Sequence, residues 1–236
     1  MERDNSVESI SVMPTKNYSI GGLFEVFYNP SKLFGNVNYN PKVLVPYFVY
    51  GILMFLFFYV TADYVVKMQM ESPSFQQRFE NGMPTNMTDL MKYNVIIFGT
   101  LLSLIIPIIS TGFAIFFGNF IYGVKENFKK VFSVVIFSAF IIAVGKIIVL
   151  PMILAKGSVM ISLSPAILVS HLGADSFLYV LFSKFDLFII WEIIVAGIGF
   201  SIIYNLPRNK GYMLSVLSVG MISIIHILYA AFGKLL

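Results

Sequence analysis

Residues 95–118, VIIFGTLLSLIIPIISTGFAIFFG, decide how this chain folds, because the stretch has no charged side chain and is too long for a buried strand. It lies within the 32 uncharged residues between Lys92 and Lys125. A helix that crosses the hydrocarbon core of a bilayer needs about 20 predominantly apolar residues. The stretch therefore predicts a transmembrane helix over about residues 95–120.

Four further stretches have the same character. They cover residues 43–62, 131–154, 187–206 and 211–233. Of these, the second contains one charged residue, Lys146, the third contains Glu192, and the last contains no charged residue but contains His226. Hydrophobic residues make up 58% of the chain and charged residues 12%, against roughly 25% charged in a soluble domain. The expected fold is an all-α integral membrane protein with five transmembrane helices.

The positions of lysine and arginine suggest an orientation. With the N-terminus inside, nine of these residues fall on the inner side and six on the outer side. The tight loops around Lys129 and Arg208 weigh most, since short loops follow the positive-inside rule. We therefore expect the N-terminus inside and the C-terminus outside.

The N-terminal region divides in two. Residues 1–20 are polar and are expected to form a disordered cytoplasmic tail, and residues 21–236 a single membrane domain. Within Gly21–Asn40, Leu23, Phe24, Phe27 and Tyr28 would share one helical face. Asn29-Pro30 is typical of a helix start and Gly35 of a stop. The pattern favours two short helices lying in the membrane interface.

Two outer segments also show helix signals. Ser72-Pro73 and Asn81-Gly82 predict the start and the stop of a small helix. In residues 157–174, Ser164-Pro165 and Gly173 bracket only about two turns, which favours an outer or half-inserted helix over a sixth span. Asp175 would then cap an amphipathic lead-in that continues into the helix of residues 187–206.

Small residues mark where the helices should pack, because lipid is as apolar as leucine and helix association depends on close contact. The second predicted span carries a continuous small face at three- and four-residue steps: Gly99, Ser103, Pro107, Ser110, Ala114 and Gly118. Pro107 should kink this helix, and Ser103 is placed to hydrogen-bond freed backbone. Bundle packing explains such a face, and a transport path along it is an alternative.

Three polar residues inside the spans, Lys146, Glu192 and His226, are the candidate functional cluster. Each charge at the centre of a helix costs about 2.5–3.5 kcal/mol on insertion scales, so it needs a partner or a role. At 1.5 Å per residue, all three fall in one layer on the outer side. The sequence predicts a Lys146–Glu192 ion pair with His226 nearby, either as a structural pair or as a substrate or proton site.

The sequence lacks the residues and motifs that several classes of enzyme need. The chain has no cysteine and two histidines, and no nucleotide-binding, hydrolase or zinc-protease motif is present. Its basic residues form no stripe, so nucleic acid is not an expected partner. We therefore expect no enzymatic activity, no metal and no cofactor.

The chain resembles the Yip family, the Ypt/Rab-GTPase-interacting membrane proteins, in its prokaryotic branch. The resemblance rests on residues 23–30 (LFEVFYNP) with Lys32-Leu33-Phe34, Pro41 and Pro46, on residues 185–191 (FDLFIIW) followed by Gly197 and Gly199, and on the five-span plan. Asp186 and Trp191 are the positions that the resemblance marks. The longer N-terminal region and the Asp-Leu-Tyr-Gly-Pro motif of eukaryotic members are missing, so Rab binding is not carried over.

What the resemblance implies is a small protein of a prokaryotic plasma membrane without catalysis, similar to bacterial relatives that accompany ABC-type exporters. The leading hypothesis is an accessory or assembly protein that binds membrane lipid and other membrane proteins, among them ABC-type exporter components or further copies of the same chain. One alternative is a small-solute or ion transporter that uses Lys146, Glu192 and His226. Another is membrane shaping by the N-terminal helices around Phe24 and Leu33.

Overall fold

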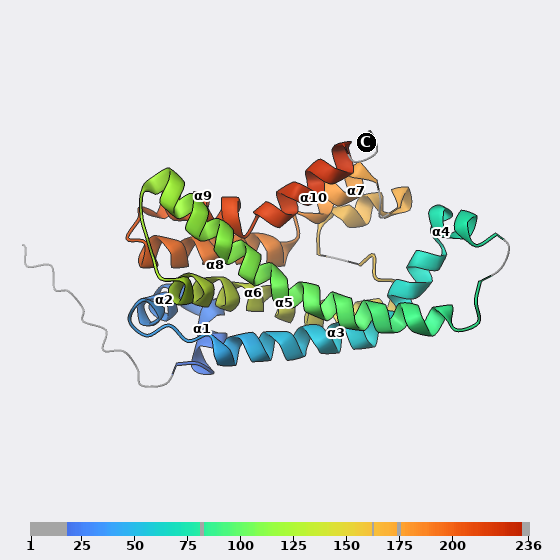
Figure 1. Cartoon of the computed structure of the whole chain (residues 1–236), viewed down its shortest axis with the longest axis horizontal. Coiled ribbons are helices and arrows are strands. Elements are labelled where there is room, and N and C mark those ends of the chain that lie inside the picture. Colours follow the sequence, from blue (N-terminus) through green and yellow to red (C-terminus); the bar gives the residue numbers. More distant parts are fainter. Residues whose placement is uncertain (1–17, 81–82, 162, 174–175, 233–236) are drawn as a thin grey trace, which may run out of the picture.

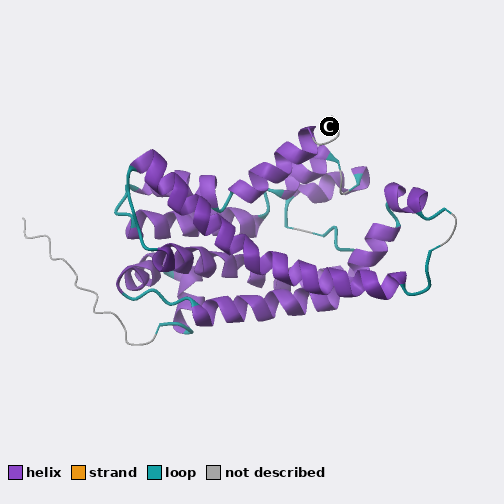
Figure 2. Ribbon diagram, in the orientation of Figure 1, coloured by secondary structure: helices purple, strands orange, loops and turns teal. Residues whose placement is uncertain are grey.

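The computed structural model describes residues 18–80, 83–161, 163–173 and 176–232, and within these ranges it contains helices and no strand (Figures 1 and 2). The elements are α1 (Gly21–Tyr28), α2 (Pro30–Tyr39), α3 (Leu44–Met70), α4 (Pro73–Arg78), α5 (Met87–Tyr122), α6 (Phe128–Lys156), the 3₁₀ helix η1 (Pro165–Leu172), α7 (Phe177–Ser183), α8 (Leu187–Ile203), α9 (Arg208–Ser218) and α10 (Met221–Phe232). The predicted all-α class is confirmed.

Three helices, α3, α5 and α6, are long and apolar enough to cross a membrane. Two further crossings are formed only if bent pairs are each counted as one span, since α7 and α8 meet at 49°, as do α9 and α10. The predicted helix over 187–206 corresponds to α8, whereas the predicted continuous helix over 211–233 is wrong, because the chain there is divided between α9 and α10. The lead-in that was to continue into α8 is the separate helix α7, and α9 stops at Ser218.

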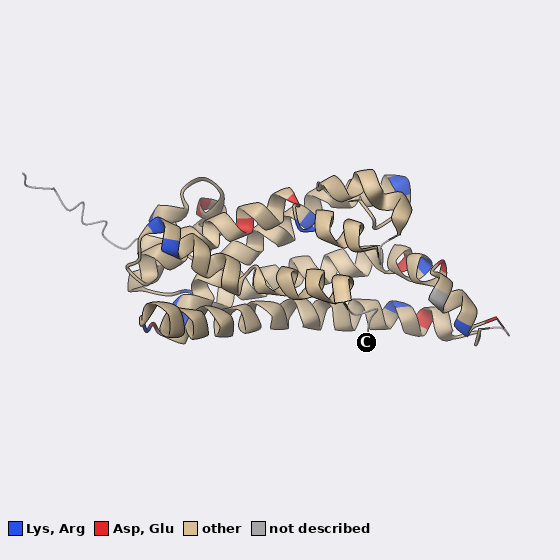
Figure 3. Cartoon of the chain, turned by 90° about the horizontal axis from the view of Figure 1, so that it is seen from above, with Lys and Arg blue, Asp and Glu red and all other residues tan. Residues whose placement is uncertain are grey.

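The long helices lie side by side along the bundle, with α1, α2 and α9 at one end and α4 at the other (Figure 1). We call these the α2 end and the α4 end. Helix α6 is central, because 67% of its most apolar window is buried, against 22% for α3 and for α5. Charged residues gather toward the two ends, with few between (Figure 3).

The N-terminal helices are part of the bundle core. Val26, Leu33, Phe34 and Val37 are fully buried and belong to the main hydrophobic cluster, with α2 against α8 and α1 against α6. The predicted single face is wrong, because Leu23 is buried whereas Phe24 and Tyr28 are 66% and 73% exposed.

Local signals around these helices were partly right. The Asn29 side chain accepts a hydrogen bond from the amide of Lys32 at 3.2 Å, as the Asn-Pro helix start predicts. Helix α2 runs through Gly35 to Tyr39, so the predicted stop is wrong. Tyr18, assigned to the disordered tail, is buried and its hydroxyl donates to the carbonyl of Asn40. Residues 1–17 lie outside the described ranges.

The short segments at the α4 end follow their signals. Helix α4 begins at Pro73 as predicted, while the Asn81-Gly82 stop lies outside the described residues. The 3₁₀ helix η1 begins at Pro165, where the Ser164 hydroxyl accepts from the amide of Ala166, and it ends before Gly173 at φ 86°. Asp175, the predicted cap, is outside the described residues, and Ser176 precedes α7.

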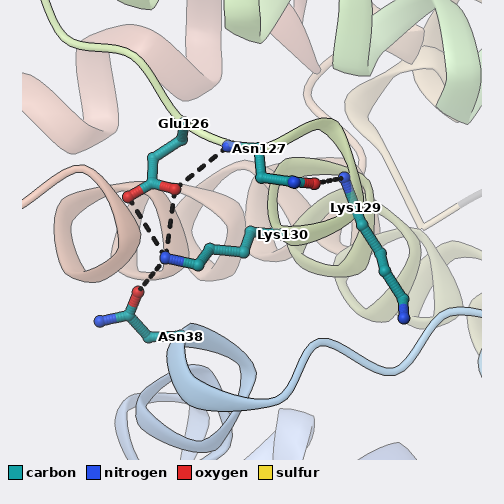
Figure 4. Close-up of polar contacts among 5 residues, drawn as sticks. All are labelled: Asn38, Glu126, Asn127, Lys129 and Lys130. Carbon is teal, nitrogen blue, oxygen red and sulfur yellow. Dashed lines mark hydrogen bonds and ion pairs between the residues drawn. The ribbon is translucent and has the colours of Figure 1, made fainter.

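At the α2 end, a polar cluster joins the start of α6 to α2 (Figure 4). The Lys130 ammonium lies 3.2 Å from Glu126 Oε2 and 3.2 Å from Asn38 Oδ1. The Asn127 side chain accepts from the amide of Lys129 at 2.8 Å and so caps α6. These contacts fix the entry of the central helix against the N-terminal hairpin.

Candidate functional site

A cavity of about 470 Å³ lies within the bundle, between α3, α5, α6, α8 and α10. We call it the central cavity. Lys146, Lys184 and Glu192 line it, together with apolar side chains that include Met54, Phe58 and Ile106. Its volume falls in the range of about 300–1,000 Å³ that small-molecule sites occupy.

Lys146 stands on α6, and its ammonium lies 4.6 Å from the centroid of the Phe57 ring on α3. A cation over an aromatic face gains roughly 0.5–2 kcal/mol, which offsets only part of the cost of a charge within a bilayer. Among the described residues, no carboxylate lies within 4.0 Å of this ammonium. The lysine is thus held by a ring and faces the cavity without a counter-ion.

Glu192 lines the same cavity from α8. In the described part of the chain its carboxylate makes neither an ion pair nor a hydrogen bond, and the predicted Lys146–Glu192 ion pair does not form. The depth estimate placed Glu192 from the centre of a straight span. If α7 and α8 form one bent crossing, its centre lies near Ile190, so Glu192 lies closer to the middle of that crossing than the estimate placed it.

His226 stands on α10 and is exposed outside the central cavity, so the structure does not place it with Lys146 and Glu192. Its Nδ1 atom lies 2.9 Å from the ammonium of Lys184. Sequence analysis missed Lys184, because a lysine between two apolar stretches was interpreted as a span end. A signal was present in the polar residues Ser183, Lys184 and Asp186 that interrupt an otherwise apolar run.

A second cavity, of about 300 Å³, adjoins the first and shares Lys146 and Lys184 with it. We call it the outer cavity. Asp186 lines it, and the Asp186 side chain also caps α8 by accepting from the amide of Phe188 at 2.9 Å. The two lysines therefore stand between two chambers, with Glu192 in one and Asp186 in the other.

Trp191, the other position marked by the resemblance, does not line either cavity. Its ring packs edge-to-face on Phe27 of α1, with centroids 5.4 Å apart. Phe27 also contacts Phe140 of α6 at 6.1 Å. Trp191 thus joins α8 to the N-terminal hairpin.

The small-residue face of α5 packs inside the chain and borders the central cavity. Five of its members are buried and Gly99 faces the ring of Phe58: Gly99, Ser103, Pro107, Ser110, Ala114 and Gly118. The first four line the cavity. Because Pro107 lacks an amide hydrogen, the carbonyl of Ser103 loses its helical partner, and Tyr50 donates its hydroxyl to that carbonyl at 3.3 Å. The Ser103 hydroxyl itself donates to Gly99 at 2.7 Å.

Both helix breaks border the cavities. Lys184 and Asp186 stand at the break between α7 and α8, and Val219 stands at the break between α9 and α10. At 1.5 Å per residue, α9 is only about 16 Å long, which is about half the thickness of a hydrocarbon core of about 30 Å. Within the described residues, no group of three or more histidine, cysteine or acidic side chains could hold a metal ion.

Comparison with known proteins gives one match. The family model described as the Yip1 domain matches residues 24–231, which is most of the chain. No curated protein and no solved structure matches.

Proposed function

This chain belongs to the Yip1 domain family, a family of membrane proteins, and from that premise we propose that it binds a small polar solute inside its bundle, without catalysis, as a transporter or a solute-binding subunit. One observation supports this choice above the others. Lys146 and Glu192 stand on different helices, line one cavity and form no ion pair within 4.0 Å among the described residues. A prokaryotic plasma membrane remains the proposed location.

The physical argument concerns the cost of buried charge. A charge within a bilayer is expensive and is retained where it faces water, a partner or a ligand. Discontinuous helices that end near the bilayer midplane border the solute sites of many secondary transporters. Here Lys184 at one break and Val219 at the other line the cavity that holds both charges.

Accessibility of the cavity tests this function, and the absence of cysteine makes the test simple. Ser110→Cys places a thiol in the central cavity, and Gly112→Cys on the same helix places one where no neighbouring atom lies within 4 Å of the Cβ position. A water-soluble thiosulfonate reacts with thiolate, which requires water. We expect S110C to react in native membranes, because the cavity would hold water. We expect G112C not to react, because lipid would surround that exposed position of the apolar helix α5. An unreactive S110C would contradict a hydrated solute site.

A second candidate is the accessory role, in which the chain binds other membrane proteins such as ABC-type exporter components or a second copy of itself. Helix α10 favours it, because this apolar helix has no buried residue and contacts its own chain weakly. Mild-detergent purification from native membranes, with cross-linking and mass spectrometry, tests it. Stoichiometric recovery of another membrane protein would favour the accessory role, and recovery of the chain alone would favour solute binding.

A further inference from the structure

We infer that the central cavity takes a zwitterionic small molecule with an apolar body, such as an apolar amino acid, with its carboxylate at Lys146 and its ammonium at Glu192. The inference rests on the proposed solute-binding function and names its ligand class. It follows from the signs of the two charges, the absence of an ion pair between them, the total charge of the two cavities and the apolar lining of the central cavity.

The first step is that the cavity presents both signs of charge and does not pair them. The Lys146 ammonium lies over the ring of Phe57 with no carboxylate within 4.0 Å, and Glu192 has no polar partner among the residues that the structure describes. The carboxylate that shares the outer cavity with Lys146 is that of Asp186, which caps α8. Their charged atoms lie beyond the 4.0 Å that defines an ion pair. A ligand that carries one carboxylate and one ammonium would satisfy both at once, which a singly charged ligand would not.

The second step is the charge balance. Lys146, Lys184, Glu192 and Asp186 are the charged residues of the two adjoining cavities, two of each sign. Lys184 is engaged with His226 at 2.9 Å, and Asp186 with the amide of Phe188. A ligand of zero net charge keeps this balance, whereas a simple anion or cation would leave an uncompensated charge in a medium of low dielectric constant.

The third step is the wall. Most of the cavity lining is apolar, and includes Met54, Phe58, Leu102, Ile106 and Ile193. The uncharged polar side chains of the lining are those of Tyr50, Ser103, Ser110 and Ser223, and the first two donate their hydroxyls to backbone carbonyls within the protein. The wall therefore offers contact to an aliphatic or aromatic side chain and few donors to a polar one.

Ligand-induced thermal stabilisation of the full chain in lipid nanodiscs tests this inference. The probes are alanine, leucine and phenylalanine, with 4-methylpentanoate and 3-methylbutylamine as leucine analogues that lack the ammonium or the carboxylate. We expect leucine or phenylalanine to raise Tm, and the matching analogues to bind at least tenfold more weakly. Ligand that binds only the folded state raises Tm by mass action.

Variants assign the two charges. Glu192→Gln should remove the preference for leucine over 4-methylpentanoate. Lys146→Met should remove the preference for leucine over 3-methylbutylamine. Glu71→Gln and Lys67→Met are matched controls on an exposed pair at 3.9 Å and should change neither preference. If a charge-removing variant does not fold, Glu192→Asp and Lys146→Arg keep the charge and should weaken leucine binding while retaining discrimination.

The outcomes separate this inference from the function on which it rests. Equal binding of leucine and 4-methylpentanoate to the parent protein would overturn the zwitterion and indicate a carboxylate site. Absence of any zwitterion-specific shift, with S110C reactive, would overturn the inference and leave solute binding standing. An unreactive S110C together with no shift would remove both.

Discussion

At the scale of single residues, Pro107 and Tyr50 act as a pair. Proline removes the amide that would bond the carbonyl of Ser103, and the Tyr50 hydroxyl donates to it instead, at 3.3 Å. Tyr50→Phe should therefore lower the free energy of unfolding by about 1 kcal/mol, the scale of hydrogen bonds between membrane helices. Equilibrium unfolding in mixed detergent would measure the loss.

A double-mutant cycle isolates that hydrogen bond. Pro107→Ala restores the missing amide, so Tyr50→Phe should cost much less in the Pro107→Ala background than in the parent. Tyr59→Phe, on the same helix but 62% exposed, is the control for loss of a tyrosine hydroxyl. Equal costs of Tyr50→Phe in the two backgrounds would show that the bond to Ser103 has no energetic role.

Tyr18, outside the membrane-spanning helices, gives a pH dependence. Burial raises the pKa of its phenol to about 12 from 10.0, although a hydrogen bond with the backbone of Lys42 opposes this in part. A raised pKa means that the neutral phenol stabilises the folded protein below pH 10, and that this contribution is lost as pH rises from 10 to 12. Thermal unfolding should show a steeper loss of Tm in that interval for the parent than for Tyr18→Phe. Superimposable pH profiles of the two proteins would refute this role.

At the scale of elements, α8 and α9 approach closely where Gly197 of α8 packs against Gly211 and Tyr212 of α9. A Cβ at Gly197 would lie 2.9 Å from the backbone Cα of Tyr212, which cannot swing away as a side-chain end can. Gly197→Ala should therefore destabilise the protein by about 1–3 kcal/mol. Gly112→Ala, on α5 with no atom within 4 Å, should instead be neutral or stabilise by up to about 1 kcal/mol. Similar effects of the two alanines would mean that the α8–α9 contact is not tight.

The N-terminal hairpin offers a matched pair of phenylalanines. Phe34 of α2 is fully buried beside Gly199 of α8, whereas Phe24 of α1 is 66% exposed. Phe34→Ala should cost about 3–5 kcal/mol of unfolding free energy, and Phe24→Ala much less. Denaturation in detergent micelles measures both. A small loss at Phe34 would favour a hairpin that lies on the bilayer, as the membrane-shaping hypothesis requires.

These elements also mark how far sequence reasoning reaches. The apolar stretches and the starts at Asn29-Pro30 and Ser164-Pro165 were predicted, because mean hydropathy and capping are local properties. The break at Gly220 was not predicted, because apolar character continues across it and the bend depends on packing between helices. At Asp186 the polar residues were interpreted only as the end of a span, so that bend was not predicted either. Likewise, Lys146 and Glu192 were identified in the sequence as charges within apolar stretches. The absence of an ion pair between them and the contact of Lys184 with His226 were not predicted, because both depend on packing between helices.

At the scale of the whole molecule, orientation and the number of crossings are linked. The loops that join α5 to α6 and α8 to α9 lie at the α2 end, and α4 lies at the opposite end (Figure 1). Lys125 in the first loop and Gln77 on α4 are both exposed, and Tyr229 near the end of α10 is 72% exposed. If α9 and α10 form one bent span, Tyr229 and Gln77 lie on the same side of the membrane and Lys125 on the other.

Single cysteines at these three positions, in a chain that has none, test this arrangement with a membrane-impermeant maleimide. With the N-terminus inside, Gln77→Cys and Tyr229→Cys should be labelled in intact cells, and Lys125→Cys only after permeabilisation. The reverse pattern at all three would keep the crossings and invert the orientation, which rests on nine basic residues against six. If Tyr229→Cys and Lys125→Cys were both labelled only after permeabilisation, while Gln77→Cys was labelled in intact cells, α9 and α10 would instead form a re-entrant pair. The break at Gly220 would then be a turn within the membrane, and the central cavity would be bordered by a re-entrant loop in place of a bent span.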